Sequence, residues 1–162
     1  MRFILKDKLF SLGRDLSIQD DHGQEVYFVD GKVISLGRRL EIKDLAGNII
    51  ATIQQRLIAL RPTYEIHLEG IEVIISKRFS LITDRLKINV PGPGDLEVHG
   101  DIFHHEYTID QGRREVARVT KRWVSLVDAY GIEVAEGVDP LLILASAVVI
   151  DELLDERRED HD

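Results

Sequence analysis

The hydrophobic pattern of the chain changes near residue 140, where short alternating segments give way to one continuous apolar run. In segments such as Leu40-Glu41-Ile42-Lys43, apolar and charged residues alternate with a period of two, which is typical of a half-buried β-strand. Residues 141–150 are apolar except for Ser146, so a helix over them would be apolar on every side and must be enclosed. The pattern therefore predicts a curled sheet around one central helix.

The residues flanking the apolar run predict where this helix begins and ends. Asp139 can act as the N-cap, and Pro140 fits the first helical turn, where its missing N–H costs nothing. Ten residues span about 15 Å, whereas a bilayer core needs roughly 20 residues, so no transmembrane segment is predicted. We predict a central helix over 139–157. The acidic residues from Asp151 onward are interpreted as a solvated, fraying end, with 158–162 as an acidic tail.

A near-duplicate at the start of the chain predicts a repeated strand-and-turn unit. Residues 11–20 align with residues 35–44 at an offset of 24, and Gly23 matches Gly47. In both copies the strand ends on an aspartate, and a glycine follows three positions later. Aspartate caps local N–H groups and glycine tolerates positive φ, so each copy predicts one arm of a β-hairpin.

Further alternating segments bring the total to about a dozen short strands. The clearest lie at 49–53, 64–68, 71–75, 86–90, 96–98, 107–109, 116–119, 124–127 and 132–135. The Pro-Gly stretch at 91–94 is a turn, and no linker divides the chain. We expect a single domain over 1–162, a barrel or sandwich whose interior is filled by one helix about 10 Å across.

Composition narrows the classes of function. The formal net charge of −8 argues against nucleic-acid binding, and the absence of cysteine excludes disulfides, thiolate metal sites and a cysteine nucleophile. The first residues include charges and lack the hydrophobic region of a signal peptide, so we expect a cytoplasmic protein. No nucleophile elbow, phosphate loop, zinc-protease or dinucleotide-binding motif is present. This favours a non-enzymatic protein without a cofactor.

Several segments together resemble the LURP-one-related family. They are the 11–20 and 35–44 repeat, Arg61 to Ile66, Gly100 to Phe103 and Asp139 to Leu144, and the resemblance covers nearly the whole chain. The family, which includes YxjI-like bacterial proteins, is similar to the tubby C-terminal domain and to phospholipid scramblases. The resemblance implies a mainly β, tubby-like barrel of about twelve strands that encloses a hydrophobic C-terminal α-helix. No phosphoinositide-binding motif of tubby domains matches here position by position.

A basic stretch supplies the candidate ligand-binding residues. If residues 113–122 form a strand, Arg114, Arg118 and Arg122 share one face because their separations are even. Such a stripe can bind phosphate groups through bidentate hydrogen bonds. The predicted ligand is an anionic lipid headgroup or a phosphorylated small molecule. The alternative is a solvated face whose arginines pair with neighbouring carboxylates.

The histidines do not predict a metal site. His104 and His105 are consecutive and would point to opposite faces of a strand, so they cannot easily share one metal ion, and His99 and His105 would share a face only across a turn. Two further functions stay open. One is a protein-interaction or structural module without a small-molecule site, and the other is an unrecognised hydrolase whose catalytic groups meet only in space.

Overall fold

A computed structural model describes residues 1–7, 16–34, 37–78, 85–89 and 94–159. The elements in chain order are β1 (Arg2–Asp7), β2 (Leu16–Asp20), β3 (Glu25–Ile34), β4 (Gly37–Asp44), β5 (Ile49–Gln55), β6 (Thr63–Leu68), β7 (Ile71–Arg78), β8 (Arg85–Asn89), β9 (Leu96–Asp101), β10 (Glu106–Gln111), β11 (Arg114–Thr120), β12 (Ala129–Val134) and α1 (Pro140–Glu159). Parts of the predicted repeat (11–15 and 35–36), of the Pro-Gly turn (91–93) and of the tail (160–162) lie outside the described residues.

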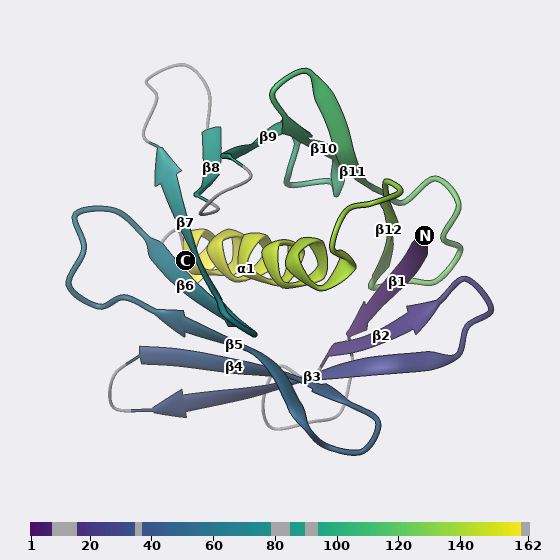
Figure 1. Cartoon of the computed structure of the whole chain (residues 1–162), viewed down its shortest axis with the longest axis horizontal. Helices are drawn as coiled ribbons and strands as arrows, with labels where there is room; N and C mark the ends of the chain where they lie inside the picture. The colour runs from purple at the N-terminus through teal and green to yellow at the C-terminus, as the bar shows by residue number, and fades with distance from the viewer. Residues whose placement is uncertain (8–15, 35–36, 79–84, 90–93, 160–162) are drawn as a thin grey trace.

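The strands form one antiparallel sheet in which each strand pairs with its neighbours in the chain. β1 pairs with β2 on one side and with β12 on the other, where Phe3 lies opposite Ile132, so the strand order closes on itself. The sheet curls around α1, which runs through the middle of the molecule (Figure 1). The predicted mainly β chain with a single C-terminal helix is confirmed.

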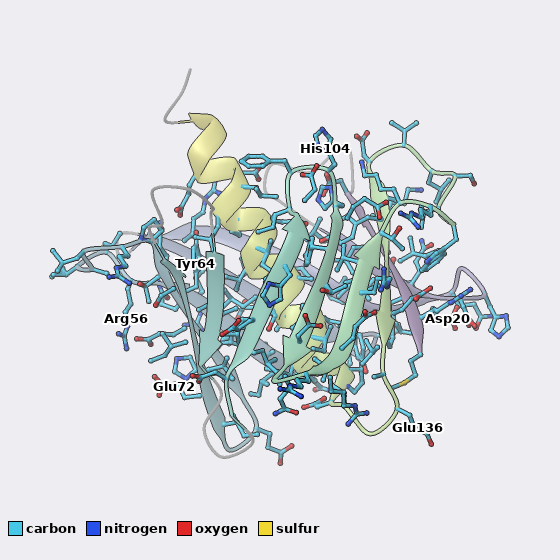
Figure 2. All side chains as sticks on the ribbon, turned by 90° about the horizontal axis from the view of Figure 1, so that it is seen from above. Asp20, Arg56, Tyr64, Glu72, His104 and Glu136 are labelled. Atoms are coloured by element: carbon cyan, nitrogen blue, oxygen red, sulfur yellow. The ribbon has the colours of Figure 1, made fainter. Side chains whose placement is uncertain are left out.

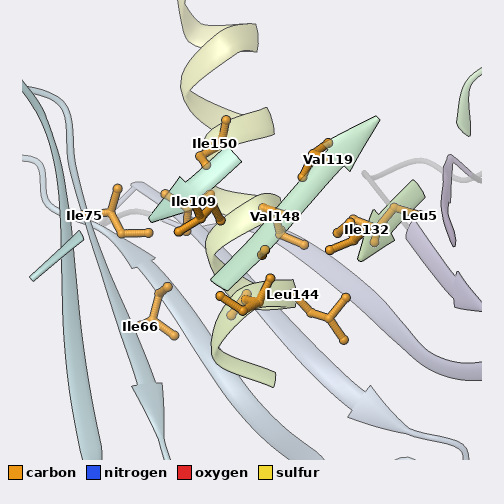
Figure 3. Packing of buried hydrophobic residues seen from close by; sticks show 14 of the residues in the cluster. Leu5, Ile66, Ile75, Ile109, Val119, Ile132, Leu144, Val148 and Ile150 are labelled. Atoms are coloured by element: carbon orange, nitrogen blue, oxygen red, sulfur yellow. The ribbon is translucent and has the colours of Figure 1, made fainter. Parts of the chain in front are cut away.

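The core lies between the inner face of the sheet and the helix. Alternate residues of each strand point inward, as Tyr64 and Ile66 of β6 do, while His67 is exposed. The helix contributes the rest of the core, because residues 143–150 are all buried. Figure 3 shows Leu144 and Val148 of α1 among aliphatic side chains from the strands. The helix is therefore enclosed by protein, as its apolar circumference predicts.

Local hydrogen bonds fix the start of the helix and its one polar interior residue. The Leu141 N–H donates to Oδ1 of Asp139 at 3.0 Å, which confirms the predicted N-cap. The Ser146 hydroxyl donates to the Leu142 carbonyl oxygen at 2.7 Å. This bond satisfies a fully buried hydroxyl within the helix itself, so Ser146 needs no other partner.

The repeated turns have the predicted geometry. Asp20 accepts hydrogen bonds from the backbone N–H groups of His22 and Gln24, and Gly23 has a φ of 78°. In the second copy, Asp44 accepts from Asn48, and the equivalent glycine has a φ of 87°. The two turns connect β2 to β3 and β4 to β5, so the sequence repeat corresponds to the turns of two β-hairpins.

The predicted strand at 124–127 is wrong. These residues belong to the loop between β11 and β12, where Val127 is 84% exposed. β11 ends at Thr120 because the Glu106 carboxylate accepts hydrogen bonds from its hydroxyl and from the Lys121 N–H. Asp128, at a φ of 61°, then turns the chain into β12. Apolar composition alone did not distinguish an exposed loop from a strand.

Candidate functional site

The three arginines of the predicted stripe do not form one face of one strand. Arg114 begins β11 and donates to the Glu136 carbonyl oxygen at 2.7 Å. Arg118 makes a bidentate pair with Glu115, at 2.9 and 2.7 Å. Arg122 lies beyond the end of β11, with its Nε 3.8 Å from the Glu106 carboxylate.

A β-bulge explains why even spacing was misleading. Ile109 pairs with Ala117 and Asp110 pairs with Glu115, so Val116 is an extra residue in β11. One extra residue reverses which side chains face outward on the two sides of the bulge. The prediction that Arg114, Arg118 and Arg122 share one face of a strand is therefore wrong. Their binding of an anionic ligand stays a prediction.

The three neighbouring histidines contact different carboxylates. Nδ1 of His104 lies 2.6 Å from Asp101 on the surface, and Nε2 of His105 lies 3.0 Å from Asp151 of the helix. His99 lies between strand carboxylates, with the nearest at 3.4 Å. Within the described parts of the chain, no group of three or more His, Cys, Asp or Glu side chains is placed to hold a metal ion.

A small cavity of about 180 Å³ lies beside the C-terminal half of α1. Asp151 lines this cavity and accepts a hydrogen bond from the Tyr130 hydroxyl at 2.5 Å, while its other oxygen faces His105. The His105 ring stacks on Tyr130 with 4.3 Å between the ring centroids. His105 is held in this place by a left-handed backbone, with a φ of 53°, in the β9–β10 turn.

The chemistry of this cavity is that of an anchor for the helix. Burial, and next the negative charge of Asp151, raise the pKa of Tyr130 well above its usual value, so the phenol keeps its proton and donates. No Ser, Thr or Cys is among the described residues that line the cavity. Nδ1 of His105 is buried and has no hydrogen-bond partner in the described structure. Among the described lining residues, the histidine therefore has no hydroxyl or thiol to activate.

A second polar cluster holds the opposite side of the helix. A guanidinium nitrogen of Arg38 lies 2.6 Å from the carboxylate of Glu152, which is only 2% exposed. The Tyr64 hydroxyl and the Gln55 side-chain amide both donate to Glu156 at 2.5 Å. The interpretation of the acidic residues as a fraying, solvated end from Asp151 onward is therefore wrong. Helix α1 continues to Glu159, and Asp151, Glu152 and Glu156 bind it to side chains of the surrounding strands and turns.

Among the described residues, the most exposed apolar segment is the loop of residues 56–62, which joins β5 to β6. Ile58 and Leu60 are fully exposed, and Leu57 is more than half exposed. Arg56 and Arg61 flank these aliphatic residues; Arg56 pairs with the Glu65 carboxylate. The loop projects from the body of the molecule, with Arg56 at the outer edge in Figure 2. We call residues 56–62 the aliphatic loop.

Sequence reasoning missed the aliphatic loop. Its signal was present as three aliphatic side chains between two arginines, directly after the alternating β5 strand and before Pro62. Proline does not fit inside a central strand, and arginine side chains favour solvent. A short aliphatic segment between two arginines and followed by proline is therefore typical of an exposed loop. Exposed aliphatic clusters of this kind mark contact surfaces.

Comparison with known proteins places the chain in a family. The family described as LURP-one-related matches residues 1–151. The chain belongs to the LURP-one-related family. It is 31% identical over 155 residues to the protein YxjI of Bacillus subtilis (strain 168), a match that covers 95% of this chain and 94% of YxjI. YxjI itself carries the description uncharacterized.

A solved structure shows the same fold for this LURP-one-related chain. The X-ray structure of a protein from Arabidopsis thaliana superposes with a TM-score of 0.61 at 14% sequence identity, covering 94% of this chain and 91% of that protein. In the described residues of the LURP-one-related chain, no helix has the length and apolar character needed to cross a bilayer.

Proposed function

We propose that this LURP-one-related chain is a non-enzymatic, tubby-like barrel domain that docks reversibly on anionic lipid surfaces through the aliphatic loop. The observation that carries this proposal is the full exposure of Ile58 and Leu60 between Arg56 and Arg61. Aliphatic side chains next to arginines suit the boundary between headgroups and acyl chains, where the aliphatic parts leave water and the guanidinium groups meet phosphates.

The magnitudes favour reversible docking over permanent anchoring. Removing Ile58 and Leu60 from water contributes about 1.5–3 kcal/mol each, or about 3–6 kcal/mol together. A single myristoyl chain, with a binding constant of about 10⁴ M⁻¹, gives similarly marginal attachment. A second source of attraction is therefore needed, and Arg61 supplies it at about 1 kcal/mol for a basic residue near an anionic surface.

The overall acidity of the chain sets the conditions for this docking. The net charge of −8 repels an anionic membrane at long range, whereas the projecting loop carries two arginines. Docking is therefore expected with the loop facing the membrane. The bound fraction should depend on the proportion of anionic lipid and on salt, because added salt weakens both the attraction and the repulsion.

Sedimentation with vesicles tests the proposal. The full chain is mixed with vesicles of phosphatidylcholine containing phosphatidylserine, and the bound fraction is compared for the wild type and for Ile58→Ser combined with Leu60→Ser. The matched control is Leu45→Ser, which removes another exposed leucine from the β4–β5 turn at the other end of β5. We expect at least about a tenfold loss of binding for the loop variant and none for the control.

The outcomes also separate the other hypotheses. If the loop variant binds as well as the wild type while replacement of Arg114, Arg118 and Arg122 by alanine abolishes binding, the arginine stretch is the site and the loop proposal is wrong. Absence of binding to anionic vesicles by the wild type also contradicts the proposal. That result would favour the protein-interaction hypothesis.

A further inference from the structure

A groove of about 620 Å³ lies at the end of the sheet where α1 begins. It is formed by residues of β3, β4, β5 and β6, the turn after β6 and the first turn of the helix. This end of β5 is opposite the aliphatic loop, which follows the other end of the same strand (Figure 1). The β5–β6 hairpin therefore has the aliphatic loop at one end and the groove at the other.

The lining of the groove combines aliphatic and acidic side chains. Ile50 and Leu141 are half-buried, and Ile49 is about half exposed. Asp44 and Glu69 supply carboxylates, and no Lys or Arg lines the groove among the described residues. The groove therefore suits a segment with aliphatic side chains and positive charge.

One segment of this chain has that chemistry. The aliphatic loop carries Leu57, Ile58 and Leu60 between two arginines, and Arg61 forms no ion pair or hydrogen bond through its side chain within the described structure. On the groove side, Glu69 likewise has no side-chain partner among the described residues. An unpartnered cation on the loop thus corresponds to an unpartnered carboxylate at the groove.

We propose that the aliphatic loop of one copy of the protein docks into the β3–β6 groove of a second copy, with Arg61 facing Glu69. Loop and groove are different surfaces, so the contact is heterologous, and a pair of copies keeps one unused groove on the first copy and one unused loop on the second. A single loop in a groove buries less area than the roughly 1,200 Å² of a standard stable interface, so the association is weak and depends on concentration.

The contact is independent of lipid but uses the same loop as the proposed membrane docking. A loop seated in a neighbouring copy cannot enter a bilayer, so self-association and vesicle binding compete. The two proposals fail separately, because groove substitutions disrupt only self-association whereas loop substitutions disrupt both.

Sedimentation velocity of the purified full chain without lipid tests the contact. The wild type should show a weight-average mass that rises with protein concentration. Arg61→Glu and Glu69→Arg should each weaken the association by at least about fivefold, because each places two like charges opposite one another. Both positions are exposed, so the fold should be unchanged, which far-UV circular dichroism verifies.

Mixing the two variants provides the decisive measurement. In an equimolar mixture, the Arg61→Glu loop meets the Glu69→Arg groove, and the unchanged loop meets the unchanged groove. Association should therefore return toward that of the wild type. A wild type that stays monomeric at every concentration, single variants that associate like the wild type, or a mixture that does not recover would each overturn the proposal. The Glu69→Arg variant should still bind anionic vesicles.

Discussion

Truncating Leu144 measures how much the enclosed helix contributes to stability. Leu144 is fully buried in the second turn of α1, among aliphatic side chains of the surrounding strands. Leu144→Ala removes three carbon atoms from the core, which costs about 2.4 kcal/mol at about 0.8 kcal/mol per buried CH₂. The surrounding sheet is held by hydrogen bonds on both sides of each strand and cannot collapse fully into the space. The cavity term brings the expected cost to about 3–4 kcal/mol.

The measurement is urea denaturation followed by circular dichroism, with Leu142→Ala as the matched control. Leu142 lies in the same helix but is only half-buried, so its truncation removes fewer contacts and should cost clearly less. The expected loss for Leu144→Ala corresponds to a fall of about 6–16 °C in Tm for a domain of this size. Equal costs for the two variants would refute the conclusion that the helix is enclosed by the sheet.

Three further substitutions test other contacts. Gly131→Ala should cost about 1–3 kcal/mol and shift the emission of the single tryptophan, because the new Cβ would overlap the Trp123 ring; unchanged emission would contradict that packing. Arg38→Ala removes the guanidinium that pairs with the buried Glu152 carboxylate and should cost about 3 kcal/mol, and adding Glu152→Leu should recover much of it; no recovery would argue against this ion pair. Burial raises the pKa of Glu106, but hydrogen bonds to its carboxylate outweigh this and leave the pKa below its ordinary 4.5. Its stabilising effect is therefore present above pH 4.5 and lost as pH falls through the lower folded-state pKa, so Glu106→Gln should destabilise the protein at neutral pH and approach the wild type in acid; a constant difference would refute this.

The fold could be predicted from local patterns because those patterns are governed by burial. Residues 141–150 have no polar side to expose, and the segment 40–43 has one apolar and one charged side, so each segment has one stable environment. The N-cap at Asp139 and the turn at Asp20 depend on hydrogen bonds between residues two positions apart, so the local sequence was sufficient to predict them. The loop at 124–127 was missed because its valines and leucine have the composition of a strand.

The separation of the arginines and the acidic anchors of the helix could not be predicted because they depend on register and on distant partners. A single bulge at Val116 separates the arginines of the predicted stripe, and nothing in the local sequence identifies that extra residue. Asp151 and Glu152 belong to an acidic run that is usually solvated, but they meet Tyr130 and Arg38, which are 21 and 114 residues away in the chain. Only the closed arrangement of strands brings these partners to the helix.

The position of the helix after all twelve strands has a consequence for biosynthesis. While the chain leaves the ribosome, the apolar side chains on the inner faces of the strands cannot pack against the helix until residues 140–159 emerge. The nascent protein therefore exposes apolar surface for most of its translation. Chaperones that bind exposed apolar segments should bind the growing chain until the helix emerges and dissociate once it packs inside the sheet. A premature stop codon anywhere before residue 140 would then yield an aggregation-prone product that proteases remove, instead of a shorter working protein.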